Sequence, residues 1–145
     1  MQKQRVAMGV LEKIKAKAKL EAVKFGHDYI GTEHMLLVLS RSKNPEVAKI
    51  FQDLDVDEEK ILSNKLIVAK GEKIDITKLS LSGRARKVME EAERIAETEG
   101  KEFCPRHLFI ALVRDGDGVG ALVLQEVLHL NKAELADRVQ LALLY

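Results

Sequence analysis

Residues 26–39 read GHDYIGTEHMLLVL, a stretch in which one helix is expected to end and another to begin. Gly26 suits the left-handed C-cap of the first helix. Thr32 and Glu33 suit the first turn of the next one, where a hydroxyl can cap free N–H groups and a carboxylate favours the positive end of the helix dipole. The apolar run that follows predicts that the helix at 32–40 is the most buried of its unit.

The same pattern occurs a second time further along the chain. Residues 100–113 read GKEFCPRHLFIALV, so Gly100 stands 74 positions after Gly26 and His107 stands 73 positions after His34. The apolar positions on either side keep nearly the same offset. A match that is mostly of apolar class indicates two copies of one unit, each of about 65 residues, with a shared packing scheme.

Apolar periodicity predicts four helices in each unit. In the first unit they cover 11–25, 32–40, 45–54 and a fourth helix that carries Ile61, Leu62, Leu66 and Ile67. In the second unit they cover 83–99, 106–113, 119–128 and 132–144. The residues expected to begin or cap these helices are Asn44, Pro45, Asp57, Ser82, Pro105 and Asn131. The chain is therefore predicted to be all-α, with repeat one at about 10–69, a linker at 70–80 packed on the surface, and repeat two at about 81–144.

The composition narrows the possible partners. The chain has 145 residues, of which 24 are Lys or Arg and 23 are Asp or Glu, and a net charge of +1 gives no general attraction to nucleic acid or to an anionic membrane. The single cysteine, Cys104, excludes an internal disulfide and fits a reducing compartment. Residues 11–20 carry four lysines, so neither a signal peptide nor a membrane span is expected, and the expected location is the cytoplasm.

Several stretches of the sequence have residues that are typical of catalytic or metal-binding motifs. Neither GxxxxGK[ST] nor GxGxxG occurs, and residues 115–120, DGDGVG, lack the ligand spacing of a calcium loop and indicate a turn between helices. Of the neighbouring His27 and His34, only His34 recurs in the second unit, as His107. Hydrogen bonds from His34 and His107 to local backbone are therefore expected rather than a zinc site.

Two further side-chain groups have a similar double interpretation. Cys104 lies beside a helix start, which would favour a thiolate, but no orienting third group is recognisable and a role as a helix-cap substitute or small buried residue is expected. The basic run from Arg84 to Lys87 is followed at once by Glu90, Glu91 and Glu93. Such mixed charge is typical of a solvated helix face with ion pairs, not of a nucleic-acid site.

The stretch 26–39 resembles the signature of the N-terminal repeat of Clp-type ATPases, which reads G-H-x-Y-I-G-T-E-H-[IL]-L-L-x-L. Residues 81–88, LSGRARKV, resemble the start of the second repeat of that family, F-T-P-R-A-K-K-V, and residues 49–54 fit its third helix. The resemblance covers roughly residues 10–144, and the motif G-H-x-Y-I-G-T-E-H is most similar to that of the ClpC-like branch. It implies two pseudo-symmetric four-helix repeats that form an eight-helix bundle, mounted flexibly on a hexameric AAA+ unfoldase.

The resemblance also implies a function. A domain of this kind docks adaptor proteins and protein substrates, which the unfoldase passes to a Clp protease, and it has no catalysis of its own. No cofactor is expected in this domain, because ATP and magnesium would bind only to AAA+ modules outside the chain. No nucleic acid or membrane partner is expected, and the isolated domain is expected to be monomeric.

In the ClpC-like branch the domain also resembles a receptor for phosphorylated arginine. Thr32 and Glu33 match the T-E motif involved, and Glu33 would hold the guanidinium through a bidentate ion pair. In repeat two, Ser82 matches a family threonine and Arg86 a family lysine, and Arg84 belongs to the same helix start. The candidate protein- and phosphoarginine-binding residues are therefore Thr32, Glu33, Ser82, Arg84 and Arg86.

Two departures from the family pattern limit this expectation. Arg106 stands where Glu33 stands in repeat one, and a positive charge there would repel a guanidinium. Residues 7–10 read AMGV instead of F-T-x-x, so repeat one lacks a hydroxyl cap at its start. The hypothesis is therefore that at most one phosphoarginine pocket is competent.

The sequence is also compatible with two other functions. A stand-alone accessory protein of the same fold would bind a Clp ATPase or protease ring without an ATPase of its own, and the intact mass of the endogenous protein would distinguish it. A helical regulator that binds DNA would show a salt-dependent affinity for duplex DNA, against which the balanced charge argues.

Overall fold

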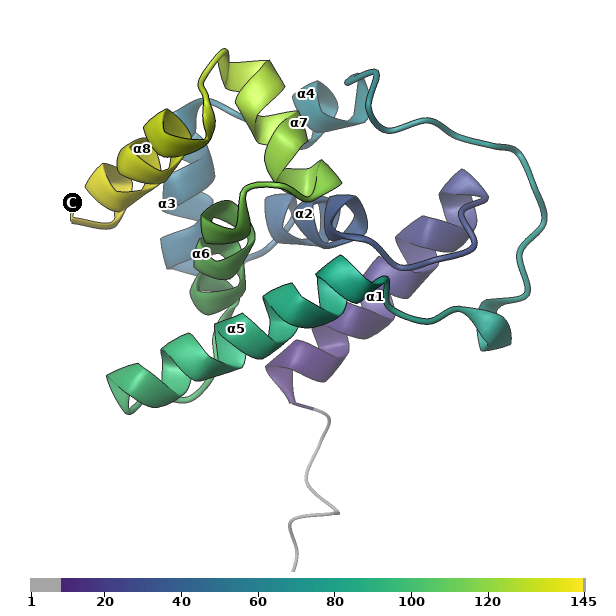
Figure 1. Cartoon of the computed structure of the whole chain (residues 1–145), viewed down its shortest axis with the longest axis horizontal. Coiled ribbons are helices and arrows are strands. Elements are labelled where there is room, and N and C mark those ends of the chain that lie inside the picture. The colour runs from purple at the N-terminus through teal and green to yellow at the C-terminus, as the bar shows by residue number, and fades with distance from the viewer. Residues whose placement is uncertain (1–8, 145) are drawn as a thin grey trace, which may run out of the picture.

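The computed structural model describes residues 9–144, and across this range the chain is all-α, as predicted (Figure 1). The only extended pairing there is an isolated parallel bridge between Ile30 and Leu81. The helices are α1 (Val10–Phe25), α2 (Thr32–Ser40), α3 (Pro45–Leu54), α4 (Glu58–Leu62), the 3₁₀-helix η2 (Ile76–Lys78), α5 (Gly83–Glu99), α6 (Pro105–Asp115), α7 (Val119–Leu128) and α8 (Lys132–Leu144). None of them is long and apolar enough to cross a membrane.

The helix ends follow from local chemistry, and most predicted caps are confirmed. Side chains of Asn44, Asp57, Ser82 and Asn131 accept hydrogen bonds from backbone N–H groups in the first turns of α3, α4, α5 and α8. Gly26 ends α1 in the left-handed conformation, at a φ of 71°. Helix α1 starts without a hydroxyl cap, because its N-cap is a glycine; residues 7 and 8, which belong to the altered start of repeat one, lie outside the described range.

The prediction for the fourth helix was wrong at its C-terminal end. Helix α4 stops at Leu62, so Leu66 and Ile67 are not part of it. Two polar side chains explain the stop: the Ser63 hydroxyl donates to the carbonyl of Glu59 at 2.9 Å, and Asn64 Oδ1 accepts from the N–H of Leu66 at 2.9 Å. Such side chains offer the backbone an alternative to helical hydrogen bonds.

The segment between α4 and α5 runs around the outside of the bundle (Figure 1). The N–H of Lys70 donates to the carbonyl of Phe25 at 2.8 Å, and the N–H of Ile30 donates to the carbonyl of Ser80 at 3.0 Å. Leu79 is buried against the core. The segment is therefore attached to the end of α1 and to the loop before α2.

Helices of the two repeats interleave in the core. Helix α1 packs on α2, and α5 packs on α6 in the equivalent way. Across the repeats, α2 packs on α7 and α3 packs on both α6 and α8, with an edge-to-face contact of Phe51 and Phe109 at 5.2 Å between ring centres. Helix α2 lies at the centre of the bundle (Figure 1), and eight of its nine residues are buried, which confirms the burial predicted for it.

The two repeats come close together where α2 begins beside α7. The N–H of Gly120 donates to the Thr32 hydroxyl at 2.9 Å. Thr32 therefore bonds to the other repeat, and the residue at the N-cap of its own helix is Gly31, which has no side chain to cap with. A Cβ atom on Gly120 would lie 2.7 Å from the carbonyl oxygen of Thr32. Only a glycine lets the two backbones come this close.

A methyl group at this contact should destabilise the whole bundle. We expect Gly120→Ala to lower the free energy of unfolding by about 1–3 kcal/mol, because neither backbone can move without disturbing the core. The measurement is urea unfolding followed by circular dichroism. The matched control is Gly83→Ala in the first turn of α5, where a Cβ meets no atom within 4 Å and stability should hold or rise by up to about 1 kcal/mol. Equal stability of the two variants would contradict the close contact.

Candidate functional site

The candidate site lies where the loop before α2 meets the segment before α5. Besides the hydrogen bond from Ile30 to Ser80, the N–H of Ser82 donates to the carbonyl of Ile30 at 2.9 Å. The Ile30 side chain is fully buried and fixes this pairing in the core. The first turn of α2, with Thr32 and Glu33, is thus held beside the first turn of α5.

Two of the predicted site residues meet at the start of α7. A Cβ atom on Gly118 would lie 2.7 Å from the Thr32 hydroxyl oxygen and 2.9 Å from Cδ of Arg84. Arg84 crosses this glycine to bond Asp115 at 2.8 Å. Thr32 and Arg84, which belong to different repeats, therefore share one contact surface on the α6–α7 turn.

The other two residues of α5 have different surroundings. The Ser82 hydroxyl accepts from the N–H of Ala85 at 3.0 Å, so it serves as the helix cap. Arg86 is exposed and forms no ion pair with the residues that the structure describes. Arg86 is thus a cation that a ligand can reach without breaking an ion pair within residues 9–144.

The carboxylate of Glu33 is covered by Tyr29. Glu33 is only 3% exposed, and its Oε2 accepts a hydrogen bond from the Tyr29 hydroxyl at 2.7 Å. Burial, together with the hydrogen bond and the negative charge of Glu33, raises the pKa of Tyr29 well above its usual value. A cationic ligand would reach this carboxylate only by displacing the phenol.

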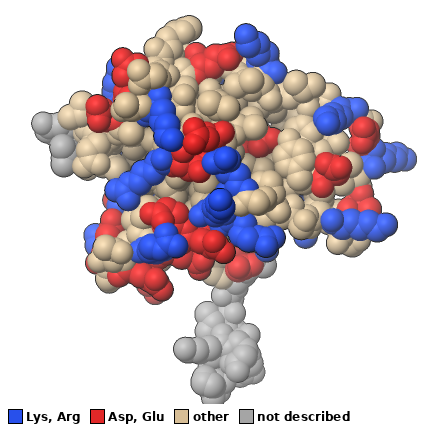
Figure 2. All heavy atoms as spheres, in the orientation of Figure 1, with Lys and Arg blue, Asp and Glu red and all other residues tan. Residues whose placement is uncertain are grey.

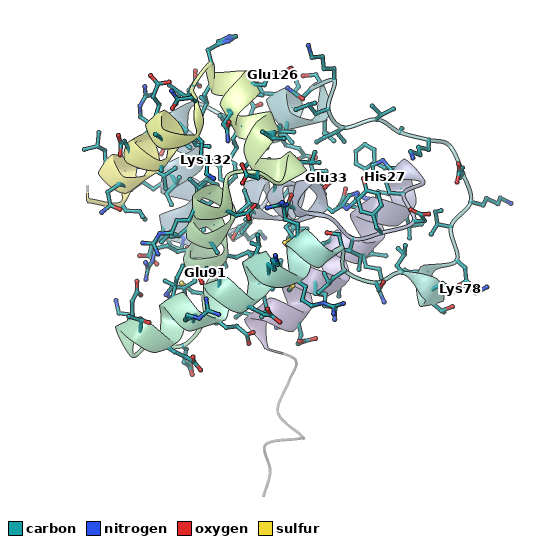
Figure 3. The ribbon with its side chains drawn as sticks, viewed as in Figure 1. His27, Glu33, Lys78, Glu91, Glu126 and Lys132 are labelled. Carbon is teal, nitrogen blue, oxygen red and sulfur yellow. The ribbon has the colours of Figure 1, made fainter. Side chains whose placement is uncertain are left out.

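Near Glu33, which Figure 3 labels together with His27, two histidines form a chain of hydrogen bonds. Nδ1 of His34 accepts from the N–H of Gly31 at 2.8 Å, so the proton of this neutral ring is on Nε2. That proton is shared with Nδ1 of His27 at 2.8 Å, and Nε2 of His27 donates to the carbonyl of Val68 at 2.6 Å. The chain ties the segment after α4 to the start of α2 and confirms the local backbone bond predicted for His34.

The same three side chains have the spacing of a metal site, but their protons do not suit one. The ligand atoms of His27, Glu33 and His34 lie within 4.8 Å of one another. Because Nδ1 of His34 already accepts a backbone N–H, a metal on Nε2 would leave the ring with no proton on either nitrogen. Metal-bound histidines normally donate through the other ring nitrogen. The group therefore fits a hydrogen-bond chain better than a metal ion.

The second repeat has a different arrangement at the same place. His107 again accepts from a backbone N–H, that of Cys104 at 3.0 Å, as predicted, but its other nitrogen bonds the carboxylate of Glu99 at 2.9 Å. Arg106 pairs with Glu99 at 2.8 Å and with Glu46 of repeat one at 3.2 Å. The hydrogen bonds from Arg106 and His107 lower the pKa of Glu99 to about 2. This repeat therefore presents a closed ion-pair cluster where repeat one has Glu33.

The model of the Clp repeat (R) N-terminal domain family matches residues 11–127. This chain belongs to that family. Over 125 residues, 84% of this Clp N-terminal domain, it is 36% identical to the negative regulator of genetic competence ClpC/MecB of Bacillus subtilis (strain 168) and 35% identical to the chaperone protein ClpB of Oceanobacillus iheyensis. The match spans only 15% of the length of each of these relatives.

A solved structure shows the same fold. The N-terminal domain of the caseinolytic protease associated chaperone ClpD from Arabidopsis thaliana superposes with a TM-score of 0.60 at 21% identity, covering 94% of this Clp N-terminal domain and 96% of that chain. The eight-helix bundle of two four-helix repeats is thereby confirmed for residues 9–144.

The histidine chain predicts a dependence of stability on pH. Burial lowers the pKa of His34 from its ordinary value of 6.5 to about 4, although the charge of Glu33 acts in the opposite direction. The unfolded chain therefore binds a proton that the folded chain excludes, so stability is complete above pH 6.5 and is lost as the pH falls towards 4.

We expect the free energy of unfolding to be lower at pH 5 than at pH 7 by about 2 kcal/mol, as measured by urea titration at both values. The control is His129→Asn. His129 is exposed and has a left-handed backbone conformation that asparagine tolerates, so this substitution should leave the difference between the two pH values unchanged. An unfolding free energy that is equal at the two pH values would show that His34 is not held neutral by the chain.

Proposed function

We propose that this Clp N-terminal domain docks adaptor proteins and protein substrates for a Clp-type AAA+ unfoldase that supplies a protease, and that it catalyses nothing itself. The observation that carries the proposal is the family match over residues 11–127. A relative that is 30% identical, from Staphylococcus saprophyticus, is described as the ATP-binding subunit ClpC of an ATP-dependent Clp protease. ATP and magnesium would then bind to modules outside this chain.

The charge distribution supports protein partners over nucleic acid. On the face shown in Figure 2, basic and acidic side chains lie next to each other over much of the surface. Helix α5 illustrates this, because Arg94 pairs with Glu91 and Arg106 pairs with Glu99 at its C-terminal end. A mixed surface of this kind does not follow a phosphate backbone.

The docking role predicts competition. Excess isolated domain should slow adaptor-dependent degradation by the Clp protease of the source organism by about twofold or more, because the free domain occupies the adaptor. Hydrolysis of a short peptide by the protease ring alone should keep its rate. The assay is loss of a fluorescent adaptor-dependent substrate. Undiminished degradation in the presence of a large excess of folded domain would contradict the docking role.

A finer proposal is that Thr32, Glu33, Ser82, Arg84 and Arg86 form one receptor for phosphorylated arginine. The pairing of Ile30 with Leu81 supports it, since it holds the first turn of α2, which carries Glu33, beside the first turn of α5, which carries Arg84 and Arg86. Binding would replace the Tyr29 phenol on Glu33 by the guanidinium. We propose no second pocket in repeat two, because Arg106 takes the equivalent position.

Charge removal at Glu33 tests this receptor. Glu33→Gln keeps an acceptor for Tyr29 but removes the negative charge, so affinity for a short arginine-phosphorylated peptide should fall about tenfold or more. The measurement is NMR titration of the labelled domain, with the unphosphorylated twin peptide as the reference. Arg106→Gln is the matched variant in repeat two and should leave the affinity unchanged. Equal losses in both variants, or equal binding of both peptides, would refute the receptor.

A further inference from the structure

A groove on repeat one shares no residue with the surface on the α6–α7 turn that Thr32 and Arg84 contact. It has a volume of about 530 Å³ and runs between α1 and the C-terminal half of α2. It is lined by Ile14, Lys17, Leu20, Glu21, Lys24, Val38, Leu39, Arg41, Ser42, Lys43 and Pro105. Its size is that of a site that holds several side chains of a ligand.

The floor of this repeat-one groove is apolar. Ile14 and Val38 belong to the core and show only their outer edges, at 6% and 8% exposure. Leu20 is different, because it is 52% exposed and, among the residues that the structure describes, is not one of the partly buried apolar residues packed against the core. An apolar partner that covers the exposed part of this side chain would therefore bind more favourably.

The rim of the groove is basic. Four cations line it, Lys17, Lys24, Arg41 and Lys43, against one carboxylate, that of Glu21. Glu21 is already neutralised, because it accepts from Arg41 at 2.6 Å and from Lys24 at 3.3 Å. Lys17 and Lys43 have no acidic partner within 4.0 Å among residues 9–144.

The equivalent groove of repeat two shows that this lining is not needed for folding. It lies between α5 and α6, has a volume of about 430 Å³, and is lined by Lys87, Val88, Glu90, Glu91, Arg94, Ala111, Arg114 and Asp115. At the repeat offset of 74, Arg94 stands where Leu20 stands and Glu91 stands where Lys17 stands. The equivalent helix pair of repeat two, α5 and α6, therefore packs with three cations and three carboxylates around its groove.

We propose that the repeat-one groove binds an acidic amphipathic helix of a partner protein. Apolar side chains of that helix cover Leu20 and Val38, and carboxylates on its flanks face Lys17 and Lys43, in the helix-in-groove mode. The lining contains no aromatic side chain on which a base could stack, which disfavours single-stranded nucleic acid. The inference rests on the docking role proposed above and specifies the surface and the chemistry of the partner.

A designed peptide tests the groove directly. The probe is a helical peptide of about 15 residues with leucines on one face and glutamates on both flanks. The control peptide has the same leucines with lysines in place of the glutamates. In NMR titrations of the full 145-residue chain, the acidic peptide should cause saturable shifts at Leu20, Val38 and Leu39, and the basic peptide should not. Its affinity should fall with added salt.

Two variants convert the groove to the lining of repeat two. Leu20→Arg and Lys17→Glu change exposed residues, so folding should be retained, and each should weaken the acidic peptide about tenfold or more. Leu122→Arg is the matched control, since Leu122 is 39% exposed on α7 outside the groove, and it should bind as the parent does.

Four outcomes would overturn the proposal: no saturable binding, equal binding of both peptides, shifts confined to the region of Thr32 and Gly118, or tighter binding of an oligonucleotide than of the acidic peptide. The competition assay of the docking role uses the natural adaptor and does not depend on this groove. Inhibition in the competition assay without peptide binding in the titration would refute the groove proposal alone. Failure of both experiments would refute the docking role as well.

Discussion

The contact of α2 with α7 at Thr32 and Gly120 is the constraint on which the rest of this bundle depends. Helix α2 is nearly all apolar, so it must be covered on every side, and its own repeat supplies only part of that cover. Helices α5, α6 and α7 of the other repeat supply the remainder, and α7 comes close enough for the N–H of Gly120 to donate to the Thr32 hydroxyl. The central helix of a repeat is therefore only partly buried by its own repeat, and helices of the other repeat cover the rest of its surface.

The same constraint positions the candidate site. The loop before α2 is also held against the segment before α5, and this pairing puts the helix turn that carries Thr32 and Glu33 beside the one that carries Arg84. Beside this loop, Tyr29 is hydrogen-bonded to Glu33 and His27 is hydrogen-bonded to His34. The residues that match the receptor motif are thus also structural, and any ligand of Glu33 competes with an internal hydrogen bond.

Local patterns in the sequence predicted the helices well, because caps and apolar stripes act within a few residues. The starts of α3, α4 and α5 and the burial of α2 were all predicted on this basis. The end of α4 was missed, because Leu66 and Ile67 continue the apolar spacing while Ser63 and Asn64 break the backbone pattern.

The candidate site could be predicted only in part. The T-E motif and the start of α5 were visible, but the partners of Thr32 and His27 lie 88 and 41 positions away in the chain, beyond the reach of any local rule. The glycines at 118 and 120 were a signal of close backbone approach that was assigned only to a turn. The repeat-one groove had a weaker signal: α1 carries five lysines and two glutamates, whereas α5 mixes both signs evenly.

The interleaved core has a mechanical consequence. The covalent connection between the repeats is a long external segment, but the force that one repeat exerts on the other is carried by α2 on α7 and by α3 on α6 and α8. A force applied through a bound partner would act on all of these helix contacts at once. The two repeats could then separate only if all of the contacts broke together. We therefore expect the domain to move as one rigid body and not as two repeats that move independently.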